Sequence, residues 1–163
     1  MGQRRQFPGS MANKLPSLTL ADLVNAGFVQ TATCEADGPG GLHLDRDIPK
    51  EPGVYLFVVD DAVNDVGVAR EGLARRVGHY ARALRRATRL RAVHHGIKHL
   101  ASRGHAAELY TLVVKPRWDT TWLPVDRLLG LESGLIEALN PGWNPFNLAG
   151  RTKRASPRQQ EQV

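Results

Sequence analysis

Only one cysteine, Cys34, occurs among the 163 residues of the chain. An intrachain disulfide is therefore impossible, which indicates a reducing compartment or indifference to the redox state of the compartment. No apolar run approaches the roughly 20 residues that span a bilayer. Residues 1–10 contain arginines but lack the apolar segment that follows them in a secretory signal. We therefore expect a cytoplasmic protein that does not contact a membrane.

The charge of the chain is unbalanced toward positive side chains. Lys and Arg together number 22 against 16 for Asp and Glu, which gives a formal net charge of +6 and a pI near 10.0. This balance suits a polyanionic partner such as DNA, although many basic proteins have no such partner. The length fits one domain, and a hydrophobic content of 42% is sufficient for a core.

Strand and helix patterns alternate along the chain. Val54, Leu56 and Val58 alternate with apolar residues of the opposite face, which predicts a strand buried on both sides. A short acidic turn and a second strand up to Ala69 follow. Helical spacing of apolar residues predicts helices over 17–26, 71–89, 89–102 and 125–139, and further strands are expected over 28–36 and 107–114.

The first of these helices has a recognisable start, since Thr19 is a candidate N-cap with Asp22 three residues later. The expected architecture is α+β, a small three-stranded and mainly antiparallel sheet flanked by helices. The helix at 17–26 and the strand at 28–36 belong to an N-terminal extension of this domain.

Two short motifs and three single residues occur in a characteristic order. Gly53-Val54-Tyr55 is followed ten positions later by Asp65-Val66-Gly67, and Arg75 lies eight residues after Gly67. Glu132 lies in an apolar run, and Asn144 follows it by twelve residues. Together these positions resemble the signature of the GIY-YIG endonuclease family. One position departs, because Asp65 replaces the family's second tyrosine.

The resemblance covers about residues 50–147 and implies a division of the chain. We expect residues 51–148 to form a GIY-YIG-like catalytic domain and residues 16–50 to form an N-terminal extension made of a helix and a loop or strand. The polar segment 1–15 and the basic segment 149–163 are expected to be disordered.

The resemblance also implies a metal-dependent endonuclease that hydrolyses DNA phosphodiester bonds, with RNA as an alternative substrate. Glu132 would hold Mg²⁺ or Mn²⁺, and Arg75 would bind the scissile phosphate. His79, one helical turn after Arg75, would relay a proton or bind phosphate. Tyr55 would take part in water activation, and Asn144 would order the site.

Each of these residues has a structural alternative. The alternative for Glu132 is a solvent-facing helix position, and the alternative for Arg75 and His79 is a solvated basic face. Tyr55 suits a buried strand tyrosine with a satisfied hydroxyl, and Asn144 suits a turn beside proline. Four further arginines are expected to contact the nucleic-acid backbone: Arg70, Arg76, Arg82 and Arg86.

Asp65 leaves three interpretations open, because an aspartate is shorter than tyrosine and ionised at neutral pH. In the first interpretation, Asp65 acts as a carboxylate base or as a second metal ligand. In the second, the activity is weakened and Tyr55 or His79 takes over the role of the missing tyrosine. In the third, catalysis is lost and nucleic-acid binding is retained. The alternative to the endonuclease is therefore a weakened or inactive nucleic-acid-binding module on the same fold.

Overall fold

The computed structural model describes residues 17–37, 41–81, 88–115, 117–118 and 125–144. A five-stranded antiparallel sheet lies at its centre, with strand order β2-β1-β5-β3-β4. The strands of this sheet are β1 (Val29–Asp37), β2 (Gly41–Leu44), β3 (Gly53–Val59), β4 (Ala62–Ala69) and β5 (Ala107–Val113). The helices are α1 (Leu20–Asn25), α2 (Leu73–Ala81), α3 (Thr88–Ala101) and α4 (Arg127–Leu139), and a separate two-stranded sheet joins β6 (Arg117–Trp118) to β7 (Val125–Asp126).

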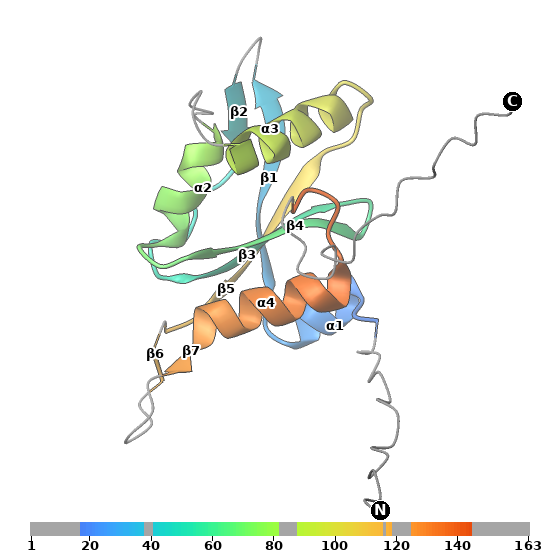
Figure 1. Cartoon of the computed structure of the whole chain (residues 1–163). Helices are drawn as coiled ribbons and strands as arrows, with labels where there is room; N and C mark the ends of the chain where they lie inside the picture. The colour runs from blue at the N-terminus through green and yellow to red at the C-terminus, as the bar shows by residue number, and fades with distance from the viewer. Residues whose placement is uncertain (1–16, 38–40, 82–87, 116, 119–124, 145–163) are drawn as a thin grey trace, which may run out of the picture.

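Helices cover both faces of the central sheet, with α2 and α3 on one face and α4 and α1 on the other (Figure 1). The strand β3 is buried on both faces, as its continuous apolar pattern predicts. Tyr55 and Phe57 point into the core beneath α2 and α3, whereas Val54 and Leu56 point into the core beneath α4. The sheet therefore separates two hydrophobic cores.

The expected number of strands was wrong, since the sheet has five strands rather than three. The strand expected over 28–36 is β1, which pairs with β5 and extends the sheet. It also pairs with β2, a strand that the sequence pattern did not indicate. In a sheet of only β5, β3 and β4, one edge of β5 would be unpaired. Pairing with β1 satisfies the backbone groups of that edge.

Local signals in the sequence are confirmed at several element boundaries. Thr19 caps α1 and forms a capping box with Asp22. The turn between β3 and β4 places Asp60 and Asp61 in the left-handed region, at φ values of 49° and 61°. Aspartate tolerates this conformation better than most residues, which suits a tight hairpin.

Three expected features fall wholly or partly outside the described residues. The helix expected over 71–89 is represented by α2, which begins at Leu73, and residues 82–87 are not described. The segments 1–15 and 149–163 also lie outside the described residues. Within the parts of the chain that the structure describes, no helix is both long enough and apolar enough for a membrane crossing.

The start of α2 is held by the segment that precedes β3. The backbone N–H groups of Leu73 and Ala74 donate to the carbonyl oxygens of Glu51 and Pro49, at 2.9 and 2.8 Å. Gly72 makes this approach possible, because it has a φ of +114° and a Cβ at its position would overlap the Lys50 carbonyl oxygen. The first turn of α2 is thus fixed against the backbone.

Substitution of Gly72 tests this arrangement. We expect Gly72→Ala to lower the free energy of unfolding more than Gly104→Ala, by about 2 kcal/mol or more. Both glycines have positive φ, but a Cβ at Gly104 (φ +83°) meets nothing within 4 Å. Gly104→Ala therefore carries only the conformational cost, about 1–2 kcal/mol. Urea unfolding of both variants measures the difference, and equal costs would contradict a close approach at Gly72.

Candidate active site

Two tyrosines and one arginine meet between the sheet and α2. The hydroxyl oxygens of Tyr55 and Tyr80 lie 2.6 Å apart, and their rings make an edge-to-face contact with 5.8 Å between centroids. Arg76 donates from Nε to the Tyr55 hydroxyl at 3.4 Å, and its guanidinium carbon lies 5.8 Å from the centroid of the Tyr80 ring. Tyr55 and Tyr80 are 0% and 1% exposed. We refer to these three residues as the tyrosine–arginine cluster.

Gly67 leaves the space that the Tyr55 side chain needs. The two residues are directly opposite each other on β4 and β3, so their side-chain positions face the same core. A Cβ on Gly67 would overlap the hydroxyl and Cζ atoms of Tyr55. The glycine of the second motif is therefore the position against which the tyrosine of the first motif packs.

Asp65 faces the tyrosine–arginine cluster. It pairs with Phe57 across β4 and β3, which places its side chain on the same face of the sheet as Tyr55. Asp65 is completely buried, at 0% exposure. The pKa of Tyr80 is raised, first by burial and then by the neighbouring Tyr55 and the charge of Asp65. Tyr80 consequently remains protonated at neutral pH.

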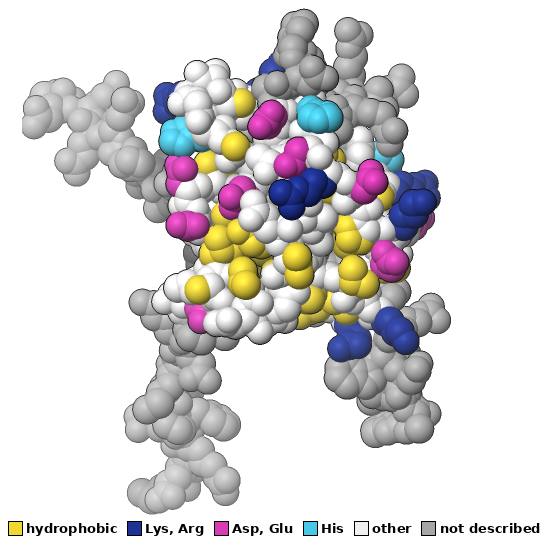
Figure 2. All heavy atoms as spheres, turned by 180° about the vertical axis from the view of Figure 1, so that it is seen from behind, with side chains coloured by type: hydrophobic (Ala, Val, Ile, Leu, Met, Phe, Trp, Pro, Cys, Tyr) yellow, Lys and Arg dark blue, Asp and Glu magenta, His cyan; other side chains and the backbone are white. Residues whose placement is uncertain are grey.

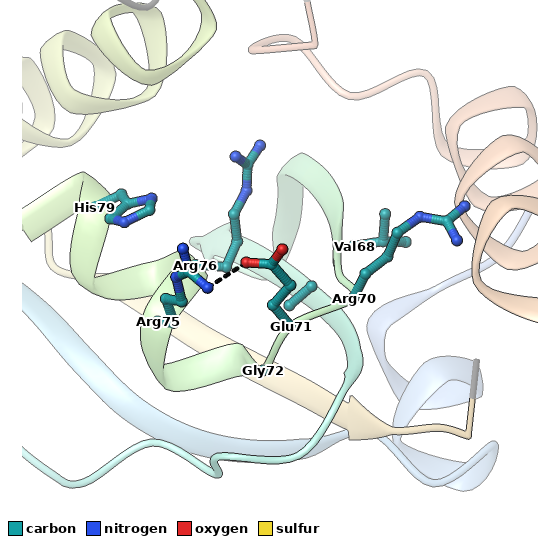
Figure 3. Close-up of a pocket in the computed structure, with 8 residues that line it drawn as sticks. Val68, Arg70, Glu71, Gly72, Arg75, Arg76 and His79 are labelled. Carbon is teal, nitrogen blue, oxygen red and sulfur yellow. Dashed lines mark ion pairs between the residues drawn. The ribbon is translucent and has the colours of Figure 1, made fainter.

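A basic pocket of about 280 Å³ opens beside the cluster, where β4 ends and α2 begins (Figure 3). Its lining residues are Val68, Ala69, Arg70, Glu71, Gly72, Arg75, Arg76 and His79. The side chains of successive β4 residues alternate between the two faces, so Val68 and Ala69 bring both faces to this pocket. The pocket therefore lies at the outer edge of the sheet, between the end of β4 and the first turns of α2.

Arg75 and Arg76 differ in their surroundings although they are adjacent in sequence. The side chain of Arg75 is 65% exposed and forms an ion pair with Glu71 (Figure 3). Arg76 is half-buried and contacts Tyr55. His79 is half-buried and lines the pocket with both arginines. The structure thus brings Arg76, rather than Arg75, to the first signature tyrosine.

Glu132 occupies the side of α4 that faces the sheet. It lies one turn after Leu128 and one turn before Ile136, both of which are buried against the sheet. Glu132 is half-buried, whereas Glu137 on the opposite side of α4 is exposed. Because α4 and Asp65 are on opposite faces, the sheet lies between Glu132 and Asp65.

Asn144 binds the outer edge of β4. Its amide oxygen accepts from the Val66 N–H and its amide nitrogen donates to the Val66 carbonyl oxygen, both at 2.9 Å. The Trp143 N–H donates to the Asn64 carbonyl oxygen at 2.7 Å. The segment after α4 therefore satisfies backbone groups of an edge strand, directly beside Asp65.

Comparison with known proteins places this arrangement in a recognised fold. The structure of a mutant of bacteriophage T4 EndoII, a GIY-YIG nuclease, superposes with a TM-score of 0.60 at 17% sequence identity. The match covers 78% of this chain and 99% of that chain. The chain has the fold of the GIY-YIG nucleases. The magnesium-bound GIY-YIG domain of UvrC from Thermotoga maritima matches at a TM-score of 0.40 and 24% identity, over 60% of this chain and 86% of that chain. No protein-family model and no curated protein matches the sequence.

The residues present are suited to a hard divalent ion that retains most of its waters. Within the described ranges, no group of three or more His, Cys, Asp or Glu side chains is placed to hold a metal. Mg²⁺ is commonly bound by one or two carboxylates together with substrate phosphates and water. Glu132, a half-buried carboxylate on α4, is the residue that would hold such an ion.

Sequence patterns did not assign Arg76 or Tyr80 to the site. Arg76 was expected only to contact nucleic acid, and Tyr80 was assigned to the apolar stripe of its helix. Helical spacing could have indicated the position of Arg76. It lies three residues after Leu73 and four before Tyr80, and is therefore next to the buried face of α2. Arg82 and Arg86 lie outside the described residues, and Arg70 forms an ion pair with Asp126.

The hydrogen bonds of Asn144 lead to a pH-dependent prediction. Asn144→Asp retains the oxygen that accepts from Val66 N–H but places a carboxylate oxygen against the Val66 carbonyl. The new carboxyl would have a folded-state pKa above the ~3.9 of free aspartate, so its protonation favours the folded state. We expect the variant to be less stable than the wild type by about 2–4 kcal/mol near neutral pH.

The difference in unfolding free energy between Asn144→Asp and the wild type should shrink as pH falls toward the unfolded-state pKa of about 4. Urea unfolding between about pH 4 and pH 8 measures this trend. Asn25→Asp is the matched control, because Asn25 is exposed. A deficit in Asn144→Asp that is constant over this range would show that the amide donor is unimportant.

Proposed function

We propose that the protein is a metal-dependent endonuclease that hydrolyses phosphodiester bonds of DNA. The observation that carries this proposal is the position of Arg76, which both lines a basic pocket and binds the hydroxyl of Tyr55. A planar guanidinium with a fixed orientation is suited to binding two oxygens of one phosphate. The GIY-YIG nuclease fold of the chain is consistent with this chemistry.

The charge distribution favours the pocket as the DNA site. Three arginines and one histidine line it, against the single acidic residue Glu71. The face seen from behind mixes acidic, apolar and a few basic side chains across its middle (Figure 2). Because a polyanion is attracted to clustered positive charge and repelled by carboxylates, the DNA backbone would approach the pocket rather than that face.

In hydrolysis, the oxygen of a water forms a bond to phosphorus and the water loses a proton, while the bond from phosphorus to the leaving sugar oxygen breaks and that oxygen acquires a proton. Arg76 would bind the phosphate and offset the negative charge that develops on its oxygens. Tyr55 and Tyr80 would hold the guanidinium in place, and His79 would accept or supply a proton at the mouth of the pocket. Glu132 would hold a divalent ion, which when bound lowers the pKa of water and stabilises charge on the phosphate.

The same fold has a second candidate function as a nucleic-acid-binding module with weak or no catalysis. The observation that favours it is the complete burial of Asp65 and Tyr55, since neither side chain reaches the surface. Asp65 also lies on the face opposite to Glu132. This placement disfavours the interpretation of Asp65 as a second metal ligand beside Glu132 and favours the interpretations in which catalysis is weakened or lost.

Plasmid nicking distinguishes the two functions. We expect the wild type to nick supercoiled DNA with Mg²⁺ or Mn²⁺ but not with EDTA, and Glu132→Ala to lower the rate by about 100-fold or more. Glu137→Ala is the matched control, because Glu137 lies on the exposed side of the same helix. Salt-sensitive DNA binding without metal-dependent nicking would identify the binding module instead.

Adjacent arginines on α2 offer a second test of the site. Arg76→Ala should reduce nicking by about 10²–10³-fold, because it removes the guanidinium held by Tyr55. Arg75→Ala should reduce it by less than about tenfold, because Arg75 is exposed and paired with Glu71. Nicking rates under saturating metal, with thermal unfolding as a check on folding, measure both effects. A larger loss of nicking in Arg75→Ala than in Arg76→Ala would indicate that Arg75, rather than Arg76, binds the phosphate.

A further inference from the structure

Arg70 connects the end of β4 to the beginning of α4. It directly follows the last residue of β4, and its guanidinium forms an ion pair with Oδ2 of Asp126. The other carboxylate oxygen of Asp126, Oδ1, accepts from the Leu129 N–H at 3.0 Å and caps α4. One carboxylate therefore both starts the helix and attaches that start to the edge strand.

The far end of α4 is attached to the same strand. After the helix ends at Leu139, Trp143 and Asn144 form the hydrogen bonds to Asn64 and Val66 described above. Thus α4 is joined to β4 both before its first turn and after its last. Glu132 lies between these two attachments, on the side of the helix that faces the sheet.

We propose that the ion pair between Arg70 and Asp126 is a positioning device, which sets the place of Glu132 along the edge of β4 and thereby the affinity of the site for a divalent cation. This inference rests on the proposed function, in which Glu132 holds that cation. Arg70 acts through Asp126 and α4, so it is a positioning residue rather than a catalytic one.

Because the ion pair between Arg70 and Asp126 is partly exposed, it is expected to affect metal binding more than folding stability. The side chains of Arg70 and Asp126 are 49% and 33% exposed, and ion pairs at such positions contribute little to folding. Metal affinity is more sensitive, since groups that only orient a ligand commonly change it by about 10–100-fold. Glu132 lies about 9 Å along the helix axis from Asp126, at 1.5 Å per residue, which is less than two helical turns.

The competing explanation is that Arg70 binds the DNA backbone directly. Substitution of Asp126 distinguishes this role from the positioning role. Removing the charge of Asp126 breaks the ion pair in either case. If Arg70 acts through the pair, Asp126→Asn reproduces the effect of Arg70→Ala on metal binding. If Arg70 binds DNA directly, Asp126→Asn leaves metal binding unchanged. Asparagine is a good N-cap, so Asp126→Asn retains the oxygen that caps α4.

Binding of Mn²⁺ alone to the DNA-free full-length protein, followed by electron paramagnetic resonance, tests the proposal. We expect Arg70→Ala and Asp126→Asn each to weaken Mn²⁺ binding by about tenfold. The double variant should show no further loss, because both substitutions remove one interaction. Arg46→Ala is the matched control, since Arg46 is an exposed arginine paired with Asp45 away from α4. Thermal unfolding temperatures should remain close to that of the wild type.

Two results would overturn the proposal. The first is a wild-type Mn²⁺ affinity in both Arg70→Ala and Asp126→Asn while Glu132→Ala binds the ion more weakly. The second is a loss in Arg70→Ala that Asp126→Asn does not reproduce. Wild-type affinity in Glu132→Ala is a different failure, because it would overturn the proposed metal site itself and with it the premise of the positioning role.

Discussion

The outer edge of β4 is the constraint on which the rest of the site depends. An edge strand presents backbone N–H and carbonyl groups that need partners, and here Asn144 and Trp143 supply partners at Val66 and Asn64. These bonds bring the end of the chain's last described helix to the strand that carries Asp65. Without them, the Arg70–Asp126 ion pair and apolar contacts, which are not directional, would hold α4 to this strand.

The two faces of this edge contribute different chemistry. The face beneath α2 holds the tyrosine–arginine cluster, in which the half-buried Arg76 donates a hydrogen bond to the hydroxyl of buried Tyr55. The face beneath α4 holds the half-buried carboxylate of Glu132. The proposed function requires a site for both a phosphate and a divalent cation, and such a site needs an arginine and a carboxylate that do not neutralise each other. Placing them on opposite sides of one strand is a simple means of keeping them apart.

Helix geometry explains why neighbouring residues on α2 have such different surroundings. Successive residues on a helix are separated by about 100°, so Arg76 lies beside the buried stripe while Arg75 projects into solvent. The same geometry separates Glu132 from Glu137 on α4. Residue type alone does not distinguish the members of either pair. Their position relative to Leu73, Tyr80 and Leu128 does, once the face that each helix buries is known.

Much of the architecture was determined by the sequence itself, because apolar periodicity and capping are local properties. The doubly buried β3, the capped start of α1 and the general α+β class follow from it, and the motif spacing indicated the GIY-YIG fold. Only the tertiary structure decided that β1 and β2 complete a five-stranded sheet, that Arg76 contacts Tyr55, and that Asp65 and Glu132 face opposite cores. These facts depend on strand pairing and helix packing between residues far apart in the chain, and no local pattern specifies them.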